Sequence, residues 1–287
     1  MRPVVLSWAR VALLALLVLA ATGCQTPNPY QRGPAPTDAS VEAPVGPFAF
    51  ASVAVPDADT PGFGAATIYH PTSTSGVTFG GVAIAPGWTE TQSAVSWFGP
   101  LLASHGFVVI TIDTNDVFDN PAARSTQLLA ALDHLTGASP VRHLVDPARL
   151  AVMGHSMGGG GSLDAAKARP SLRAVVSLTG FSPDPTWPEI QSPTLLIGAQ
   201  DDTIAPVDTF SKTFYRTLPN GLPKAYVELA GANHFVTNAR TPTVARYVTS
   251  WLKRFVDNDR RYERFLCPGP AIGGVISAYQ STCPYAT

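Results

Sequence analysis

The chain has 287 residues, of which 45% are hydrophobic and 14% charged, and its formal net charge is −1 at pH 7. This near-neutral balance excludes the strongly basic surface that nucleic-acid binding requires, so no nucleic-acid partner is expected. The length, less a leader, suits one large domain or two small ones, and it is enough to bury a substantial core.

The first 23 residues have the features of a secretory signal peptide. Arg2 and Arg10 accompany an apolar run at residues 11–20, which is too short to span a membrane, and small residues follow it. The run ends in Ala21-Thr22-Gly23-Cys24, which resembles the lipobox of bacterial lipoproteins. The sequence therefore predicts export, either as a freely secreted protein or as an outer-membrane lipoprotein lipidated at Cys24.

The remainder of the chain divides into a tether and a domain. Residues 24–47 are rich in proline, alanine and glycine, which predicts a flexible tether. A single globular domain is expected over residues 48–287. Beyond Cys24, the only cysteines are Cys267 and Cys283. Two cysteines in an exported protein predict a disulfide, which would close the C-terminal segment.

Strands and helices are expected to alternate along this domain. The expected strands are apolar runs at residues 48–55, 65–70, 80–85, 107–112, 150–153, 174–178, 194–197 and 225–229. The expected helices lie at residues 93–105, 125–135, 161–168, 206–218 and 241–256. Apolar strands alternating with helices predict a mostly parallel central sheet flanked by helices on both faces, and the antiparallel start fits the α/β-hydrolase fold.

A nucleophile motif follows one of these strands. Residues Gly154-His155-Ser156-Met157-Gly158 form a G-x-S-x-G pattern between an apolar strand and a helix, which is the context of a nucleophile elbow. The outer glycines allow strand and helix to approach across a sharp turn. The pattern predicts that Ser156 is a nucleophile, and a serine nucleophile needs a base and a carboxylate that orients the base.

The base and the acid are expected downstream, because the acid and then the histidine follow the serine in this architecture. His234 is the only histidine after the serine, and it follows the expected strand at 225–229. Chemistry in open α/β sheets lies at the carboxyl ends of strands. The acid is expected directly after the strand at 194–197, where Asp201 and Asp202 are both available, and the residues alone leave that choice open.

An oxyanion hole needs two N–H donors. One is expected from Met157, the residue after the nucleophile. The other is expected from the turn after the strand at 80–85, where Gly87 allows a close approach and Trp88 supplies the N–H. Only residues 179–193 separate two expected strands after the elbow, which leaves no room for a lid domain. An open apolar groove of this kind can admit a polymer chain.

Seven motifs, spread over nearly the whole chain from residue 48, match one family. They are Pro86-Gly87-Trp88-Thr89, Leu102–Asp113, Gly154–Gly160, Thr186-Trp187-Pro188, Asp202–Pro206, His234-Phe235 and Trp251–Asp259. Through them the chain resembles the bacterial cutinase-type polyester hydrolases, which include enzymes acting on poly(ethylene terephthalate). The resemblance implies that Asp202 is the acid and that the protein is a monomer. It also implies that Trp88 and Trp187 flank the scissile ester, with Met157, Ile204 and Phe235 lining the groove.

The chain departs from that family at several positions. Trp88 replaces the usual Tyr or Phe, and Glu90 stands where a small or neutral residue is usual, so a charge is expected on the rim of the groove. Positions that bind calcium in some members correspond to Gln200, Ala230 and Ser277. These residues are poor ligands for a hard cation, so neither a metal nor another cofactor is expected.

Together these features predict an exported serine ester hydrolase. It would cleave cutin-like aliphatic polyesters, poly(ethylene terephthalate) and short-chain esters through Ser156, His234 and Asp202, by way of an acyl-enzyme. Two alternatives stay open. A general lipase or carboxylesterase for small or lipid esters uses the same triad, and a catalytically silent hydrolase fold would serve as a binding protein, although the intact triad argues against silence.

Overall fold

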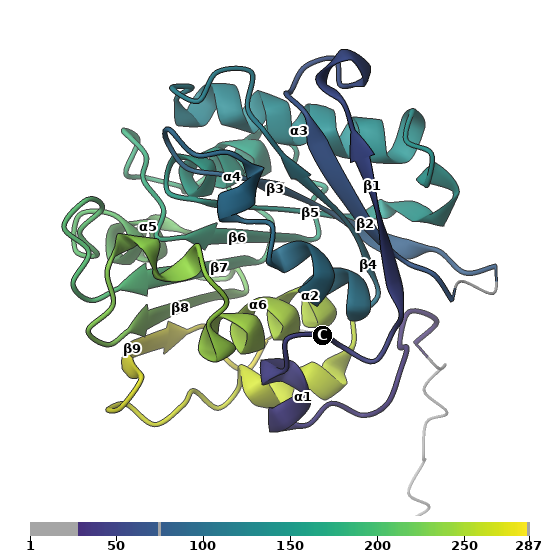
Figure 1. Ribbon diagram of the computed structural model, residues 1–287. Helices are drawn as coiled ribbons and strands as arrows, with labels where there is room; N and C mark the ends of the chain where they lie inside the picture. Colours follow the sequence, from purple (N-terminus) through teal and green to yellow (C-terminus); the bar gives the residue numbers. More distant parts are fainter. Residues whose placement is uncertain (1–27, 74–75, 286–287) are drawn as a thin grey trace, which may run out of the picture.

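A sheet of nine strands runs through the computed structural model, which describes residues 28–73 and 76–285 (Figure 1). The predicted signal peptide and Cys24 lie outside these residues. The strand order is β1-β2-β4-β3-β5-β6-β7-β8-β9. The strands are β1 (Phe50–Val55), β2 (Ala66–Pro71), β3 (Phe79–Ala85), β4 (Phe107–Ile112), β5 (Val145–His155), β6 (Ala174–Leu178), β7 (Thr194–Ala199), β8 (Lys224–Leu229) and β9 (Ile276–Ser281).

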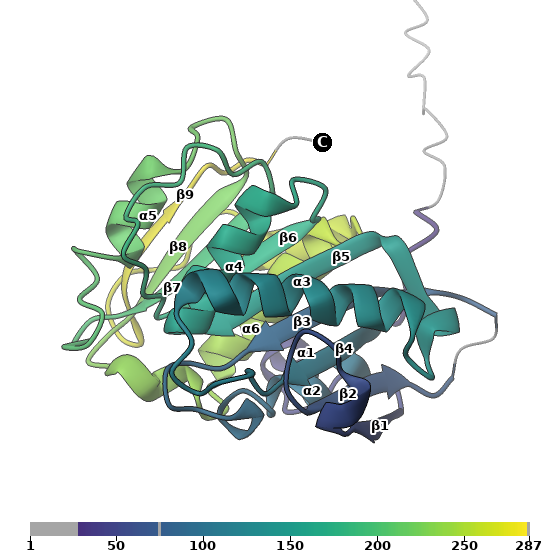
Figure 2. The same cartoon turned by 90° about the horizontal axis from the view of Figure 1, so that it is seen from above.

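Helices cover both faces of this sheet (Figure 2). They are α1 (Asp38–Glu42), α2 (Phe98–Ser104), α3 (Pro121–Gly137), α4 (Met157–Ala168), α5 (Ser211–Thr217) and α6 (Pro242–Phe255). Helices α3, α4 and α5 enclose one apolar core with the sheet, and α2 and α6 enclose a second. None of the helices within residues 28–73 and 76–285 combines the length and apolarity that a bilayer crossing demands.

The pairing of the strands confirms the predicted α/β-hydrolase fold. The pairs β1–β2, β2–β4 and β8–β9 are antiparallel, and every other pair is parallel. Every residue of β4 is buried, as a strand covered on both faces requires. Gly80 in β3 lets α6 approach closely, because a Cβ there would lie 2.4 Å from Cγ1 of Val256.

Several elements differ from the expectation. The helix expected at 206–218 covers only Ser211–Thr217. The helix expected at 93–105 is shorter: a 3-10 turn at Gln92–Ala94 precedes α2. Strand β9 carries no expectation at all. It is an edge strand in which Ile276 alone is buried, so it lacks the apolar run that revealed the central strands. This segment therefore becomes a strand because it pairs with β8, and that pairing exists only in the folded protein.

The predicted tether differs most, because its described part, residues 28–47, packs against the domain. Thr37 caps α1 through a capping box with Ser40, and Val41 is fully buried in a cluster with Tyr262 and Phe265. The side chain of Asn28 donates to the carbonyl of Asp257 at 2.8 Å. A proline-rich composition indicates little regular structure, but it does not reveal such anchors.

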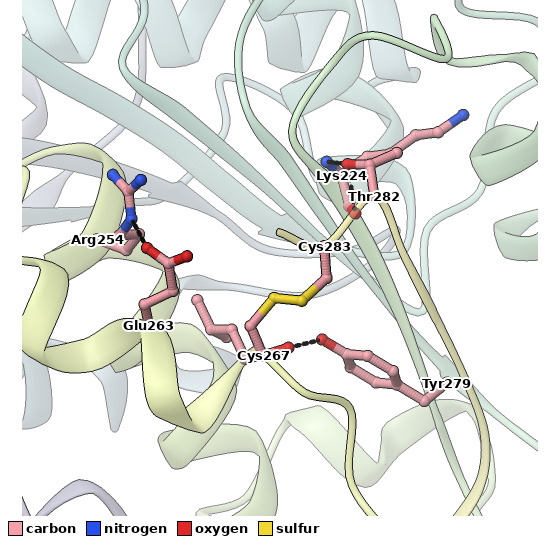
Figure 3. Close-up of a disulfide and its surroundings, with 8 residues drawn as sticks. Lys224, Arg254, Glu263, Cys267, Tyr279, Thr282 and Cys283 are labelled. Carbon is pink, nitrogen blue, oxygen red and sulfur yellow. Dashed lines mark hydrogen bonds and ion pairs between the residues drawn. A yellow bond between two sulfur atoms is a disulfide. The ribbon is translucent and has the colours of Figure 1, made fainter. Parts of the chain in front are cut away.

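The predicted disulfide is present and joins Cys267 to Cys283 (Figure 3). Their Cα atoms are 5.9 Å apart, within the range that a disulfide bridges. Cys267 follows the 3-10 helix at Arg260–Phe265, and Cys283 follows β9. The hydroxyl of Tyr279, in β9, donates to the carbonyl of Leu266. The bridge therefore fastens the edge strand to the segment that follows α6.

The packing of residues 28–47 leads to a test by truncation. A chain that begins at residue 48 lacks the buried Val41, whose burial contributes about 2 kcal/mol. It should therefore melt at a lower temperature than a chain that begins at residue 28, as followed by circular dichroism. Equal melting temperatures for the two chains would contradict this docking and would support the prediction of a flexible tether.

Candidate active site

Ser156 lies at the sharp turn between β5 and α4. Its φ is 53° and its ψ is −117°, a conformation that residues other than glycine rarely adopt. The neighbouring glycines make the turn possible. A Cβ on Gly154 would lie 2.4 Å from the carbonyl carbon of Gly158, and one on Gly158 would lie 2.4 Å from the oxygen of Pro86. Any larger residue at either position would force strand and helix apart.

The structure brings Ser156, His234 and Asp202 together. Nε2 of His234 is 2.9 Å from Oγ of Ser156, and Nδ1 of His234 is 2.7 Å from Oδ2 of Asp202. All three side chains are largely buried. His234 comes from the loop after β8 and Asp202 from the loop after β7, so each follows the carboxyl end of a strand, as expected.

The second carboxylate oxygen of Asp202 is also fixed. It accepts hydrogen bonds from the backbone N–H groups of Ile204, at 2.9 Å, and Ala205, at 2.7 Å. Burial raises the pKa of Asp202, but the hydrogen bond and charge interaction with His234 and these two backbone bonds outweigh it, so the pKa lies below its ordinary value. Asp201, the other candidate, is exposed. The geometry therefore places Asp202, and not Asp201, behind His234.

Two backbone N–H groups predicted to form an oxyanion hole belong to segments beside Ser156. Met157 is the first residue of α4, so its N–H has no acceptor within the helix. Trp88 follows Gly87, where an added Cβ would lie 3.0 Å from Cβ of Ser156. The turn after β3 thus passes directly over the serine.

Exposed apolar side chains surround these groups. Trp88, Ile204 and Phe235 are each 52% exposed, and Met157 is partly exposed. Phe118, on the loop after β4, is 61% exposed and meets Trp88 edge to face, with ring centroids 5.6 Å apart. Sequence reasoning missed Phe118, although its place shortly after the end of a buried strand is a signal that could have indicated it.

Trp187 does not lie at the surface, and the expectation that it flanks the ester is wrong. Its side chain is fully buried in an edge-to-face contact with Phe214, at 5.9 Å. Phe181 is nearer the serine: its N–H donates to the carbonyl of Ser156 at 2.9 Å, its ring packs on Phe210, and it is partly exposed. Phe181 lies three residues after β6, so it also follows a strand end, whereas the expectation for Trp187 rests only on a motif that matches the family.

Glu90 also departs from the expectation of a charged rim. Its side chain is only 14% exposed and accepts hydrogen bonds from Gly87, His155 and Asn238. Burial raises the pKa of Glu90, but the hydrogen bond and charge interaction with His155 and the bonds from Gly87 and Asn238 outweigh this, so the pKa is lowered. Glu90 is thus an internal carboxylate between the oxyanion turn and the elbow.

Two further features define the surroundings. Residues 179–193, all of them described, form no helix or strand between β6 and β7, so no lid domain is inserted there. Within residues 28–73 and 76–285, no group of three or more histidine, cysteine or carboxylate side chains is arranged to hold a metal ion.

The mostly parallel sheet with helices on both faces and the strained serine turn at a strand end define an α/β-hydrolase. A family model described as PET hydrolase-like matches residues 24–284. The chain is 54% identical to a bis(hydroxyethyl) terephthalate hydrolase of Streptomyces coelicolor, over 97% of this chain and 90% of the relative. It is 50% identical to cutinase cut1 of Thermobifida fusca (96% and 87%) and 52% identical to cutinase 2 of Thermobifida cellulosilytica (90% and 99%). The chain belongs to the PET hydrolase-like family, and it is a carboxylic ester hydrolase.

The hydrogen bonds of Asp202 lead to a prediction for Asp202→Asn. The amide keeps the volume but removes the charge that orients and stabilises His234, so turnover of a soluble ester at pH 7 should fall by about 10³–10⁴. The ratio of variant to wild-type initial rates, per mole of folded protein, measures this. A loss smaller than about tenfold would contradict the arrangement.

The pH dependence of stability gives an independent check on the same hydrogen bonds, because the pKa of Asp202 is lower in the folded than in the unfolded chain. The ionised carboxylate therefore stabilises the fold fully above its unfolded pKa, and this stabilisation is lost as the pH falls through the lower, folded pKa. The melting temperature of Asp202→Asn should lie below that of the wild type at pH 7, and the difference should shrink toward pH 2.

Proposed function

We propose that this protein hydrolyses ester bonds of polyesters, including cutin-like aliphatic polyesters and poly(ethylene terephthalate), and of short-chain esters. One observation carries the proposal: the hydrogen-bonded chain from Ser156 through His234 to Asp202, with contacts of 2.9 and 2.7 Å, beside exposed apolar side chains. The relatives named as cutinases and as a bis(hydroxyethyl) terephthalate hydrolase, matched over most of their length, support the substrate class.

The reaction uses the side chains as they lie. Nε2 of His234 takes the proton of Ser156 while Oγ attacks the ester carbonyl carbon, and Asp202 stabilises the imidazolium that forms. The N–H groups of Met157 and Trp88 donate to the developing oxyanion. The tetrahedral intermediate then releases the alcohol, which receives the proton from His234, and leaves an acyl group on Ser156. Water attacks this acyl group by the reverse sequence, freeing the acid.

The surroundings favour a chain-like substrate over a small one. Trp88, Phe118, Ile204 and Phe235 are each more than half exposed, and residues 179–193 insert no lid domain between β6 and β7. An apolar unit of a polymer can therefore lie on this surface without entering an enclosed cavity. In this proposal Phe181, and not Trp187, forms the second aromatic wall beside the scissile ester.

The remaining parts of the proposal concern the whole protein. Residues 1–23 direct export and are removed, and the mature enzyme acts outside the cell as a monomer. Lipidation at Cys24 is the alternative to free secretion. Cys24 lies outside the part of the chain that the structure describes.

The reaction and its substrate class are tested together. The wild type should release soluble products from an aliphatic polyester film and label with a fluorophosphonate probe, and Ser156→Ala should do neither. More than a few per cent residual ester hydrolysis by Ser156→Ala would refute the assignment of the nucleophile. A strong preference for emulsified long-chain triglyceride over the film would instead favour the lipase alternative.

The two aromatic positions are distinguished by a matched pair of variants. Phe181→Ala should raise KM for bis(hydroxyethyl) terephthalate several-fold and change the melting temperature little, because the ring is partly exposed. Trp187→Ala should cost about 3–5 kcal/mol of stability, because it empties a buried site. At a temperature where it remains folded, its KM should match the wild type. The opposite pattern would restore Trp187 as the wall.

A further inference from the structure

The peptide unit between Pro86 and Gly87, next to the unit that carries the Trp88 N–H, is held between two opposite charges. Its carbonyl, on Pro86, accepts a hydrogen bond from Nη1 of Arg124 at 3.1 Å. Its N–H, on Gly87, donates to Oε2 of Glu90 at 2.6 Å. Because C=O and N–H of a trans peptide point in opposite directions, the two side chains fix the orientation of the whole unit. Charge-assisted hydrogen bonds of this kind are about twice as strong as neutral ones.

The cation of this clamp is itself immobile. Arg124 has no exposed surface, and its guanidinium also donates to the carbonyls of Val117 and Asp119, each at 2.9 Å. The N–H of Thr89 donates to the carbonyl of Val117 at 2.8 Å, so the same loop holds the turn after Trp88 as well. The turn that carries the Trp88 N–H is thereby bonded on both sides of that residue.

Glu90 extends this support to the loop of the catalytic base. Its Oε2 is 2.7 Å from Nδ1 of His155, and Nε2 of His155 is 3.1 Å from the carbonyl oxygen of His234. That carbonyl also accepts a hydrogen bond from the hydroxyl of Thr179 at 3.0 Å. The other oxygen of Glu90 accepts from Asn238, which follows His234 in the same segment.

The hydrogen-bond donors determine how many protons this pair holds. A carbonyl only accepts, so Nε2 of His155 must carry a proton to bond the carbonyl of His234. Nδ1 faces Oε2 of Glu90, which already accepts the N–H of Gly87, so a further proton must lie between Nδ1 and Oε2. Because Glu90 is the acceptor of both bonds, this proton belongs to Nδ1, and the two side chains form an ion pair with no net charge. Glu90 therefore supplies an acceptor to the oxyanion turn without leaving an unpaired negative charge beside the developing oxyanion.

We propose that Glu90 is a positioning residue: through Gly87 and His155 it holds the oxyanion turn and the backbone of His234 in the geometry that ester hydrolysis requires. The inference rests on the proposed function and concerns the preorganisation of that site. Neither Gly87 nor His155 takes part in the chemistry, and Glu90 does not touch the substrate. Its effect should therefore lie in the stabilisation of the transition state rather than in substrate binding.

Glu90→Gln separates the charge from the volume. A glutamine side chain has one acceptor atom and one donor group. Because the amide is uncharged, the pair with no net charge now contains a neutral His155, which carries one proton instead of two. If the amide oxygen accepts from both Gly87 and Nδ1 of His155, the single proton of His155 lies on Nδ1. Nε2 of His155 then has no proton and cannot donate to the carbonyl of His234. If the amide NH₂ donates to Nδ1 instead, the N–H of Gly87 loses its acceptor. One of the two supports is lost in either arrangement.

The experiment compares the wild type, Glu90→Gln and a matched control, Glu189→Gln, on a soluble p-nitrophenyl ester. Glu189 is a half-exposed carboxylate paired with Lys167 on the surface, and its variant should behave as the wild type. Glu90→Gln should lower kcat about tenfold or more and change KM less than about twofold. Its affinity for an arylboronic acid, which forms a tetrahedral adduct with the serine, should fall by a similar factor.

Two outcomes would overturn the proposal. One is a kcat of Glu90→Gln within about twofold of the wild type. The other is a loss that disappears when rates are divided by the amount of Ser156 labelled by a fluorophosphonate, because the variant would then only contain less folded enzyme. Failure of the proposed function has a different signature: the wild type and Glu189→Gln would be as inactive on esters as Ser156→Ala.

Discussion

The backbone conformation of Ser156 is the constraint on which the rest of the site depends. A positive φ at a serine is unfavourable, and it persists because the surrounding contacts hold it. The N–H of Ser156 donates to the carbonyl of Leu178 at 3.0 Å, and its carbonyl accepts from Gly160 and Phe181. The turn is therefore bonded to the helix behind it and to the next strand of the sheet. The same bonds that maintain this conformation also tie the backbone of Phe181 to that of Ser156.

Two carboxylate–histidine pairs lie side by side at this turn, and they do different work. Asp202 orients the ring of His234, whereas Glu90 and His155 hold the backbone of His234 and the oxyanion turn. The two imidazole rings are 4.9 Å apart. The first pair has to change its charge distribution during the reaction. The second pair must keep its own, because its role is to prevent movement.

The strands β1 to β8 and the places of Ser156 and His234 could be anticipated because their signals are local. The residues alone left Asp201 and Asp202 open, and only the family resemblance indicated Asp202. An apolar run indicates a central strand, and a residue directly after it lies at the carboxyl end of that strand, where the chemistry of this fold takes place. The misjudged residues differ in kind. Whether Trp187 is buried depends on Phe214 in α5, and whether Glu90 is paired depends on His155 at the end of β5 and on Asn238. Such contacts exist only once distant segments have folded together, and no spacing rule describes them.

The packing of the amino-terminal segment has a consequence for the order of folding. Asn28 bonds to the carbonyl of Asp257, 229 positions away, and Arg246 of α6 pairs with Asp38 and Glu42 in α1. The surface that receives the first described residues is thus made by nearly the last helix of the chain. Contacts of such high sequence separation form late, since the long loop must first close. We therefore expect the amino-terminal segment to dock as a late step, after α6 and the residues that follow it have folded.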